Sequence, residues 1–399
     1  MNIFKSLIVF VLLTISFLTP TISYAETNNA DLAKNTKAAL LLERDTGTIL
    51  YAKNEHEKLA PASLTKIMTL LLIMEAIERE ELSVTDVVTV SERAASMGGS
   101  QVFLEAGEEM TVEDLIKAIA IASANDASVA LAEEIAGTEE IFVQRMNEKV
   151  KELQLENTKF QNSSGLPAKD HYTTAYDMAI MSKELLKYED IVNYTSIYED
   201  YLRKGEENEF WLVNTNKLVR FHPNVDGLKT GYTSEAKYCL TASALKDDMR
   251  VVAVVMGAES SKERNATVSE MINYAFSNYE TKKIYGKNET VATLRNIRTK
   301  EMTYDVQTNE QISLLYEKGK QEELDVKTEV VLHDHATLPI KRGDEVGVLY
   351  VKRNDEVMIE VPLTVAKTVD RATVFDHLKR NIKQMTKFAN SSYSISKND

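Results

Sequence analysis

Residues 61–80 constrain the fold more than any other stretch of the sequence. They read P-A-S-L-T-K-I-M-T-L-L-L-I-M-E-A-I-E-R-E, and apolar side chains between Leu64 and Ile77 occur almost all round a helix. Pro61 suits the first turn of such a helix. The pattern therefore predicts a buried helix around which the rest of the chain is organised.

Ser63 and Lys66 lie three residues apart at the start of this helix, so their side chains share one helical face. Burial disfavours the charged form of a lysine, and the positive end of the helix dipole repels a cation. Both effects lower the pKa of Lys66, and a partly neutral amine could accept the proton of the Ser63 hydroxyl. The alternative is an ordinary helix start whose lysine reaches water along its aliphatic stem.

The size and charge of the chain limit the classes of protein to which it can belong. A chain of 399 residues exceeds the usual size of a single core and indicates two folded domains. Its net charge of −14 argues against general nucleic-acid binding, which needs a basic surface for phosphate. Cys239 is the one cysteine, so no intramolecular disulfide can form. His56-Glu57 begins a zinc-like motif, but Ala60 replaces the second histidine, and we expect neither a metal nor a cofactor.

Residues 1–25 have the organisation of a secretory signal peptide. Lys5 precedes an uncharged apolar run, and Ser23-Tyr24-Ala25 permits cleavage after Ala25. The apolar run is short for a retained membrane span, which is the alternative. We therefore expect an exported protein that works at the outer face of the cytoplasmic membrane or in the cell wall.

A polar break separates two apolar helical runs at residues 115–122 and 127–135. The break reads Ser123-Ala124-Asn125-Asp126. Serine, asparagine and aspartate are good N-caps, so Asn125 or Asp126 could simply cap the second helix. In the functional interpretation, Ser123 and Asn125 project into a cleft, where one shuttles protons and the other holds an amide.

A third candidate motif, Lys229-Thr230-Gly231, lies on or beside a strand, because residues 237–245 and 249–258 after it have the pattern of a hairpin. Gly231 has no Cβ, so a substrate backbone could approach this strand edge closely. The alternative is an ordinary lysine in a turn. A similar hairpin is predicted around Asp45-Thr46-Gly47, directly before the Ser63 helix.

After an amphipathic helix at residues 263–279, the pattern changes to short strands with charged turns. We expect a small all-β domain with strands at 312–315, 328–332, 345–351 and 357–365. Residues 371–389 then form a basic amphipathic segment with five basic residues and one acid. Such a segment is typical of an interfacial membrane anchor, and the alternative is a helix docked on the β-domain.

Together the motifs S-L-T-K, S-A-N and K-T-G follow one another on a helix, an interhelical loop and a strand. This set resembles the active-site plan shared by penicillin-binding proteins and serine β-lactamases. The chain is most similar to low-molecular-mass D-alanyl-D-alanine carboxypeptidases, of the sporulation-associated type of endospore-forming bacteria. The resemblance implies an α/β (α+β) β-lactamase/transpeptidase-like catalytic domain at 26–282, a small all-β domain at 283–367 and an amphipathic tail at 368–399.

The resemblance also implies the catalytic roles. Ser63 would be the acylated nucleophile and Lys66 its general base, and Ser123 would relay the proton to the leaving D-alanine. The substrate would be the peptidoglycan pentapeptide, and β-lactam antibiotics would be covalent inhibitors. The other implied partner is an anionic membrane surface, through residues 371–389.

Five further residues would bind the substrate. Asn125 would hold its peptide group, and Lys229 with Thr230 would bind the terminal carboxylate. Gly231 would allow close approach, and the N–H of Tyr232 would complete an oxyanion hole with that of Ser63. The sequence departs from many relatives at Lys237, where they have glycine.

Two other functions remain open at the level of sequence. A β-lactamase needs a glutamate that activates water, and residues 152–157 (E-L-Q-L-E-N) only loosely resemble the loop that carries it. The other is a non-catalytic penicillin-binding or cell-wall-binding sensor. The sequence favours the carboxypeptidase, because its β-domain and tail follow that family's order.

Overall fold

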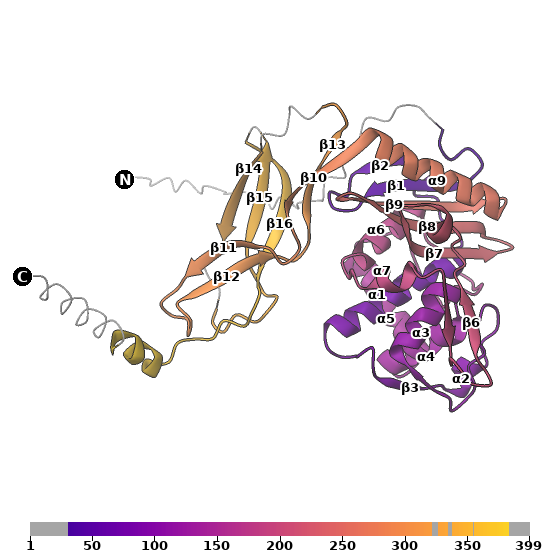
Figure 1. Ribbon diagram of the computed structural model, residues 1–399, viewed down its shortest axis with the longest axis horizontal. Helices are drawn as coiled ribbons and strands as arrows, with labels where there is room; N and C mark the ends of the chain where they lie inside the picture. The colour runs from indigo at the N-terminus through magenta and orange to yellow at the C-terminus, as the bar shows by residue number, and fades with distance from the viewer. Residues whose placement is uncertain (1–30, 321–325, 334–336, 354, 383–399) are drawn as a thin grey trace, which may run out of the picture.

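The computed structural model describes residues 31–320, 326–333, 337–353 and 355–382. The predicted signal peptide lies outside these residues. Figure 1 shows a larger body of sheet and helices, to residue 278, beside a slender β-domain that begins at β10. The expected α/β catalytic domain followed by an all-β domain is confirmed.

A five-stranded antiparallel sheet with the order β2-β1-β9-β8-β7 forms the centre of the larger body. Its strands are β1 (Ala38–Glu43), β2 (Ile49–Lys53), β7 (Val225–Thr233), β8 (Lys237–Lys246) and β9 (Met249–Ala258). The predicted hairpins around residues 45–47 and 247–248 are therefore both present. Strand β7 is at one edge of the sheet, with one side free for another chain.

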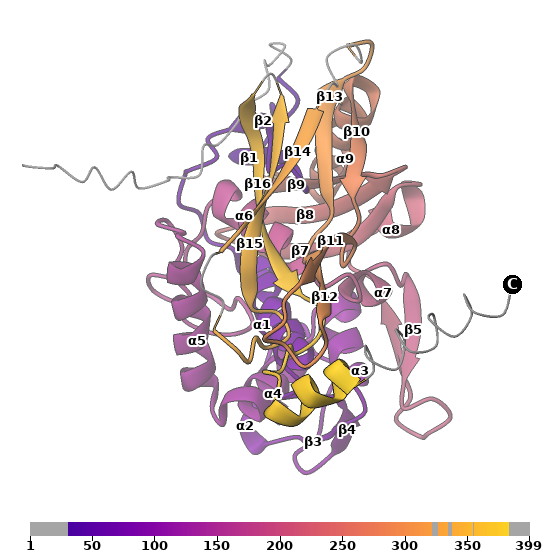
Figure 2. The ribbon, with the colours of Figure 1, turned by 90° about the vertical axis from the view of Figure 1, so that its left-hand side faces the viewer.

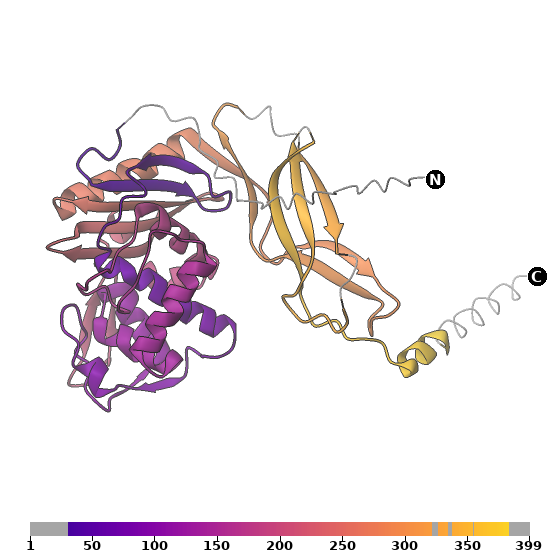
Figure 3. The same ribbon diagram turned by 180° about the vertical axis from the view of Figure 1, so that it is seen from behind.

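Helices cover both faces of this sheet (Figure 3). Helix α9 (Ser261–Asn278) packs on one face against β8 and β9. The helical half on the other face is larger and contains α1 (Lys66–Glu78), α3 (Val112–Lys117), α4 (Asn125–Ala136), α5 (Glu139–Glu152) and α6 (Ala175–Leu185). Short helices and two-stranded pairs complete this helical half. The helices are α2 (Glu92–Ala95), α7 (Ile191–Thr195) and α8 (Leu218–Phe221). The strand pairs are β3 (Val87–Thr89) with β4 (Glu109–Thr111) and β5 (Glu199–Leu202) with β6 (Phe210–Val213).

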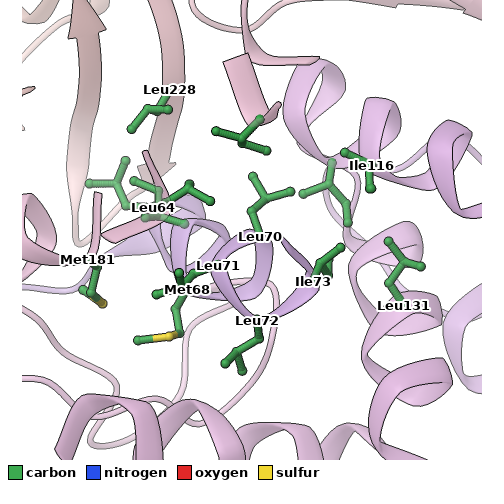
Figure 4. Packing of buried hydrophobic residues seen from close by; sticks show 14 of the residues in the cluster. Leu64, Met68, Leu70, Leu71, Leu72, Ile73, Ile116, Leu131, Met181 and Leu228 are labelled. Carbon is green, nitrogen blue, oxygen red and sulfur yellow. The ribbon is translucent and has the colours of Figure 1, made fainter. Parts of the chain in front are cut away.

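Helix α1 is the centre of the helical core, as its sequence predicts. Every residue from Lys66 to Ala76 is buried, and Leu70, Ile73 and Met68 pack among side chains of the surrounding helices (Figure 4). A short 3₁₀ turn, η1 (Ala62–Thr65), precedes α1 and carries Ser63. The nucleophile candidate therefore lies directly before the buried helix at the centre of the core.

The polar break also occurs where it was expected, but the capping prediction is wrong. Helix α3 continues into a π-helical turn, η2 (Ala118–Ala122), and Ser123 then adopts a left-handed conformation with φ of 66°. The N-cap of α4 is Ala124, without a side-chain capping bond. Asn125 and Asp126 belong to the first turn of α4, and their side chains are used elsewhere.

The β-domain is a second antiparallel sheet with its own small core, seen face-on in Figure 2. Its order is β11-β12-β16-β15-β14, and a separate pair joins β10 to β13. The bounds are β10 (Tyr279–Tyr285), β11 (Thr290–Arg295), β12 (Thr303–Thr308), β13 (Ile312–Glu317), β14 (Val326–Leu332), β15 (Glu345–Arg353) and β16 (Glu356–Val365). The four predicted strands are present, whereas β10, β11 and β12 were not predicted.

The described part of the tail contains a helix at residues 374–382. Its apolar side chains point away from the protein, with Val374 88% and Phe375 72% exposed. The rest of the predicted stripe, Met385 and Ala389, lies outside the described residues. Among the helices that the structure describes, none has the length and apolar character needed to cross a membrane.

Candidate active site

The site is built around the buried amine of Lys66. Its Nζ lies 3.2 Å from Ser63 Oγ, 2.6 Å from Asn125 Oδ1 and 2.6 Å from the carbonyl oxygen of Ser164. A neutral amine has two N–H groups and one lone pair. The two carbonyl-type oxygens can accept both N–H groups, which leaves the lone pair for the hydroxyl of Ser63.

Two glycines let neighbouring segments approach the nucleophile turn. A Cβ on Gly231 would lie 3.0 Å from the carbonyl oxygen of Pro61, and a Cβ on Gly165 would lie 1.9 Å from that of Ala62. Gly165 also has a φ of 88°, which favours glycine. Strand β7 and the segment around Gly165 can therefore press against η1 from two sides.

Asn125 connects the polar break to the nucleophile helix. Besides its bond with Lys66, its Nδ2 donates to the carbonyl oxygen of Gly98 at 2.7 Å. Asp126 instead accepts bonds from the backbone N–H groups of Val102 and Leu104. These contacts fix the loop before α4 and aim Asn125 at Lys66.

Ser123 is buried, and its Oγ has no hydrogen-bond partner among the described residues. Its left-handed backbone is unusual for a residue with a side chain and is held by the packed helices on either side. An unpaired buried hydroxyl is costly, so its retention is consistent with a partner that arrives with substrate.

Lys229 and Thr230 lie on β7, at the free edge of the sheet. Lys229 is 1% exposed, and its Nζ donates to the carbonyl oxygen of Thr230 at 3.3 Å. Thr230 Oγ1 donates to Thr215 Oγ1 at 2.8 Å, and the backbone N–H of Thr215 donates to the carbonyl oxygen of Ile121. These bonds connect the third motif to the helix before Ser123.

Gly231 and Tyr232 follow on the same strand. Gly231 packs against η1, whereas the exposed ring of Tyr232 lies tilted against Tyr238 of β8 with 4.5 Å between ring centroids. The structure thus brings the three sequence motifs, from a helix, an interhelical break and a strand, to one place.

Comparison with known proteins shows the family of the chain. A family model described as D-alanyl-D-alanine carboxypeptidase matches residues 25–260. The chain belongs to the D-alanyl-D-alanine carboxypeptidase family. A second model, described as the C-terminal domain of penicillin-binding protein 5, matches residues 279–371.

Individual relatives resemble this carboxypeptidase over most of its length. The chain is 54% identical to D-alanyl-D-alanine carboxypeptidase DacF of Bacillus subtilis, over 90% of this chain and 92% of the relative. Penicillin-binding protein 5 of Haemophilus influenzae has a similar structure, with a TM-score of 0.64, 30% identity and coverage of 84% of this chain and 98% of that one. Penicillin-binding protein D2 of Listeria monocytogenes, in an ampicillin-bound form, has a TM-score of 0.55 and 28% identity and covers 61% of this chain and 98% of its own.

The resemblance inferred from the motifs is confirmed by these comparisons, and the chain is a D-alanyl-D-alanine carboxypeptidase. Its fold agrees with that assignment, since both the catalytic body and the β-domain match their own family models. The individual roles of the site residues are a separate question and are taken up as proposals below.

The two lysines of the carboxypeptidase site both have lowered pKa values. Burial is the main cause for Lys66, the positive charge of Lys229 adds to it, and Asp126 opposes it. Burial, with a smaller effect of Arg264, lowers the pKa of Lys229 to about 7. The lowered pKa of Lys66 favours its neutral amine, which can act as a base. The lowered pKa of Lys229 means that this lysine loses its charge near neutral pH.

One part of the site was not predicted from the sequence, namely residues 161–173. Ser164 supplies a carbonyl oxygen to Lys66, and Ser163 supplies one to Thr69. Asn162 Oδ1 accepts bonds from the N–H groups of Ser164 and Gly165 and shapes the turn. The run Asn-Ser-Ser-Gly is a turn signal, but a backbone contact has no side-chain signature from which it could be recognised.

The first glutamate of the 152–157 segment, which loosely resembles the β-lactamase loop, is paired with a lysine of its own helix. Glu152 ends α5, where its carboxylate pairs with Lys149 at 2.7 Å. No side-chain carboxylate is hydrogen-bonded to Ser63 or Lys66 in the described part of the chain. Nor do the described residues contain a group of three side chains able to hold a metal ion.

Proposed function

We propose that this carboxypeptidase removes the terminal D-alanine of peptidoglycan pentapeptides through an acyl-enzyme on Ser63. The observation that carries the proposal is the 3.2 Å separation of Lys66 Nζ from Ser63 Oγ, with both other bonds of the amine directed to carbonyl-type oxygens. This geometry suits proton transfer from hydroxyl to amine.

In the acylation step, Ser63 Oγ bonds to the carbonyl carbon of the penultimate D-alanine as its proton moves to Lys66. The N–H groups of Ser63 and Tyr232 stabilise the resulting oxyanion. The C–N bond then breaks, and Ser123 passes the proton to the nitrogen of the leaving D-alanine. Water finally hydrolyses the ester, which restores Ser63 and releases a tetrapeptide carboxylate.

Substrate recognition is proposed to rest on β7 and Asn125. Lys229 in its charged form, together with the Thr230 hydroxyl, binds the terminal carboxylate. Gly231 leaves room for the substrate backbone beside η1, and Asn125 holds the peptide group. A β-lactam has the same carboxylate and an acylating carbonyl, so we expect it to acylate Ser63.

The test is Ser63→Ala in the mature chain, assayed for D-alanine release from a pentapeptide and for labelling by penicillin. Both should be lost, and mass spectrometry of the unchanged protein should place the penicilloyl group on Ser63. Ser182→Ala is the control, because Ser182 is a buried serine of α6 outside the three motifs and its hydroxyl donates to the carbonyl oxygen of Met178. A label on another serine would refute the assignment, and labelling without D-alanine release would favour a sensor.

The release rate of the penicilloyl group separates this proposal from a β-lactamase. A carboxypeptidase should keep the label far longer than it keeps the acyl group of its peptide, whereas a β-lactamase should turn penicillin over rapidly. Because Glu152 is paired with Lys149, we expect slow release.

We further propose export through residues 1–25 and attachment of residues 371–389 to the outer face of the cytoplasmic membrane. The helix at 374–382 supports this proposal, because its apolar side chains are exposed and basic residues accompany them. Burying the stripe in the lipid interface and attracting anionic lipid, at about 1 kcal/mol per basic residue, would both favour attachment. In this proposal the expected division into a catalytic domain at 26–282, a β-domain at 283–367 and a tail at 368–399 is kept, except that the β-domain takes in all of β10 from Tyr279 and the buried Val369.

Sedimentation with anionic vesicles tests the attachment. The mature chain should bind and should dissociate as salt is raised, whereas Phe375→Ser with Leu378→Ser should bind poorly. A truncation is best placed after Ala372, because Val369 is buried in the β-domain core and Arg371 bridges to Thr299. If the mature chain did not bind such vesicles at low salt, the helix would instead be docked on the β-domain. The hydrogen bonds of Arg380 to loop carbonyl oxygens would then hold it there.

A further inference from the structure

Glu139, at the start of α5, is a buried acid that belongs to none of the three motifs. The residue is 6% exposed, and its side chain bonds to other segments rather than to its own helix. The first turn of α5 does not need this carboxylate as a cap, because the hydroxyl of Thr138 already accepts the N–H of Ile141. A buried charge is costly unless it is paired and hydrogen-bonded, so the partners of Glu139 indicate what it does.

The two carboxylate oxygens of Glu139 have different partners. Its Oε1 accepts both the backbone N–H of Ser163, at 3.1 Å, and the hydroxyl of the same residue, at 2.8 Å. Its Oε2 accepts from Arg93 Nη2 of α2 at 2.9 Å, which balances the buried negative charge. Hydrogen bonds to an ionised group are stronger than those between neutral groups. Glu139 therefore holds Ser163 firmly at two atoms.

The nucleophile helix holds Ser163 at a third atom. The hydroxyl of Thr69, in α1 with Lys66, donates to the Ser163 carbonyl oxygen at 2.6 Å. The N–H, the hydroxyl and the carbonyl oxygen of this fully buried residue are thus all bonded. The next residue, Ser164, gives its own carbonyl oxygen to Lys66. Because Ser163 is held at three atoms, the direction of the Ser164 carbonyl is fixed as well.

A second side chain of α5 holds the same segment farther from the site. Asn147 Nδ2 donates to the carbonyl oxygen of Phe160, and Asn147 Oδ1 accepts the N–H of Phe160, both at 2.9 Å. Asn147 lies about two helical turns beyond Glu139. Helix α5 therefore supports residues 160–163 at two points, and only the point at Glu139 adjoins the residue that bonds to Lys66.

The direction of the Ser164 carbonyl matters because a neutral amine has only two N–H groups. The Ser164 carbonyl oxygen and Asn125 Oδ1 accept them, both at 2.6 Å from Lys66 Nζ. If the Ser164 carbonyl turned away, one N–H would lose its acceptor and the lone pair would no longer be directed at Ser63. Proton transfer requires hydrogen-bond geometry between hydroxyl and base, so acylation would slow.

We propose that Glu139 is a positioning residue for the general base of this enzyme. Through Ser163 it fixes the carbonyl oxygen of the following residue, and that oxygen orients the amine of Lys66. Glu139 does not itself touch the reacting atoms. The proposal rests on the acylation mechanism proposed above and adds to it a residue of α5 that lies outside the motifs.

The test is the kinetics of acylation by penicillin in the mature enzyme, with the dissociation constant of the first complex separated from the rate of the chemical step. Glu139→Leu removes both oxygens and should slow the chemical step by about thirtyfold, because a small misplacement of a catalytic group has an effect of this order. The dissociation constant should not change. Glu139→Gln keeps an oxygen for both bonds of Ser163 and loses only the pair with Arg93, whose side chain is 56% exposed and can be hydrated. This variant should keep a rate within a few-fold of the unchanged enzyme.

Asn147→Leu is the matched control, because it removes two hydrogen bonds from the same segment but none of those at Ser163. Chemical unfolding should show that Glu139→Leu and Asn147→Leu both lose stability, whereas only Glu139→Leu should slow acylation strongly. Equal slowing by both variants would mean that the segment responds to any loss of support, and the proposal would be overturned. Ser163→Ala, which removes one of the two bonds to Oε1, is the milder variant if Glu139→Leu does not fold. It should slow the chemical step severalfold, and an unchanged rate would also overturn the proposal.

Mass spectrometry of the unchanged enzyme separates a failure of this proposal from a failure of the acylation mechanism. A penicilloyl group on a serine other than Ser63 would refute the mechanism and, with it, the role of Glu139. If Ser63 is labelled and Glu139→Leu is labelled at the same rate, the mechanism stands and only the role of Glu139 is wrong.

Discussion

Asn125 Oδ1 lies 2.6 Å from Lys66 Nζ, so the second motif holds the proposed base of the first. The amide oxygen is neutral, and it can accept an N–H without favouring the ammonium form as a carboxylate would. The distinction between amide and acid at this position should therefore decide the protonation of Lys66.

Asn125→Asp should slow acylation by penicillin at neutral pH by at least tenfold. A carboxylate in contact with the amine raises the pKa of Lys66, because an opposite charge favours the charged form. Raising the pH should recover part of the loss. The measurement is the second-order acylation rate against pH, with Asn208→Asp at an exposed loop as the control. A pH profile identical to that of the unchanged enzyme would contradict the assigned contact.

The pH dependence of kcat/KM should be bell-shaped. The acidic limb reflects the loss of a proton from Lys66, whose pKa burial lowers well below its ordinary value. The alkaline limb should begin near pH 7, because the pKa of Lys229 is lowered to about 7 and its charge is lost above that value. In kcat the alkaline limb should move to higher pH, since a bound carboxylate favours the charged lysine. An alkaline limb at the same pH in both parameters would argue against carboxylate binding by Lys229.

Lys229→Met should make the folded protein more stable while it loses carboxylate-bearing substrates. An unfolded lysine keeps its proton up to its ordinary pKa, whereas folded Lys229 loses it near pH 7. The unfolded chain therefore binds more protons between these values, and stability should rise with pH across that window in the unchanged protein. Each pKa unit corresponds to about 1.4 kcal/mol, so below pH 7 the variant should gain a few kcal/mol.

Chemical unfolding at several pH values measures this effect, with Lys246→Met at an exposed strand end as the control. The control should change neither stability nor its pH dependence. A variant less stable than the unchanged protein at pH 6 would mean that the bond to the Thr230 carbonyl outweighs the cost of burying the charge.

The parts of the fold that the sequence predicts are those with strong periodicity or turn chemistry. The all-round apolar run at 64–77 could only be a buried helix, and the hairpins around residues 45–47 and 247–248 follow from turn residues between apolar strands. The three motifs could be assigned to a helix, an interhelical break and a strand because each lies within or beside a stretch with strong periodicity or turn residues. Strands β11 and β12 were not predicted, because most of their residues are only half-buried or exposed and the alternation is weak.

The capping error has a related cause. Ser123-Ala124-Asn125-Asp126 offers three good capping side chains, yet the cap is Ala124. The Asn125 side chain forms hydrogen bonds with Lys66 and Gly98 in place of a capping bond. The Asp126 carboxylate likewise accepts hydrogen bonds from two backbone N–H groups of the preceding loop. Tertiary partners outweighed a local preference, and nothing in the local sequence records those partners.

Gly165→Ala should disrupt the site more than would be expected from the strain of a positive φ alone. A Cβ there would lie 1.9 Å from the Ala62 carbonyl oxygen, so either the 161–173 segment or the nucleophile turn must move. We expect a loss of penicillin acylation of at least a hundredfold together with reduced stability. Gly107→Ala is the matched control, because Gly107 also has a positive φ but no atom within 4 Å of the added Cβ. Equal effects of the two changes on acylation would mean that the close approach to Ala62 does not matter.

The last prediction concerns Asp45, in the turn between β1 and β2, which holds the β-domain against the catalytic domain. Its Oδ2 accepts bonds of 2.8 Å from both Ser313 Oγ and Gln311 Nε2, and its side chain is 1% exposed. Hydrogen bonds to a buried charge contribute about 1.5–3 kcal/mol each. Asp45→Ala should therefore loosen the two domains, whereas Asp45→Asn keeps an oxygen acceptor and should change their arrangement less.

Spin labels at Lys151→Cys and Lys327→Cys measure the distance distribution between the domains. Cys239 should not be labelled, because it is buried and burial raises the pKa of its thiol to about 11. Asp45→Ala should broaden the distribution, and D-alanine release from a soluble pentapeptide should persist because no site residue is involved. If all three proteins gave the same narrow distribution, the ion pair of Lys187 with Glu310 and the bond of Lys287 to the Lys187 carbonyl would suffice to fix the domains.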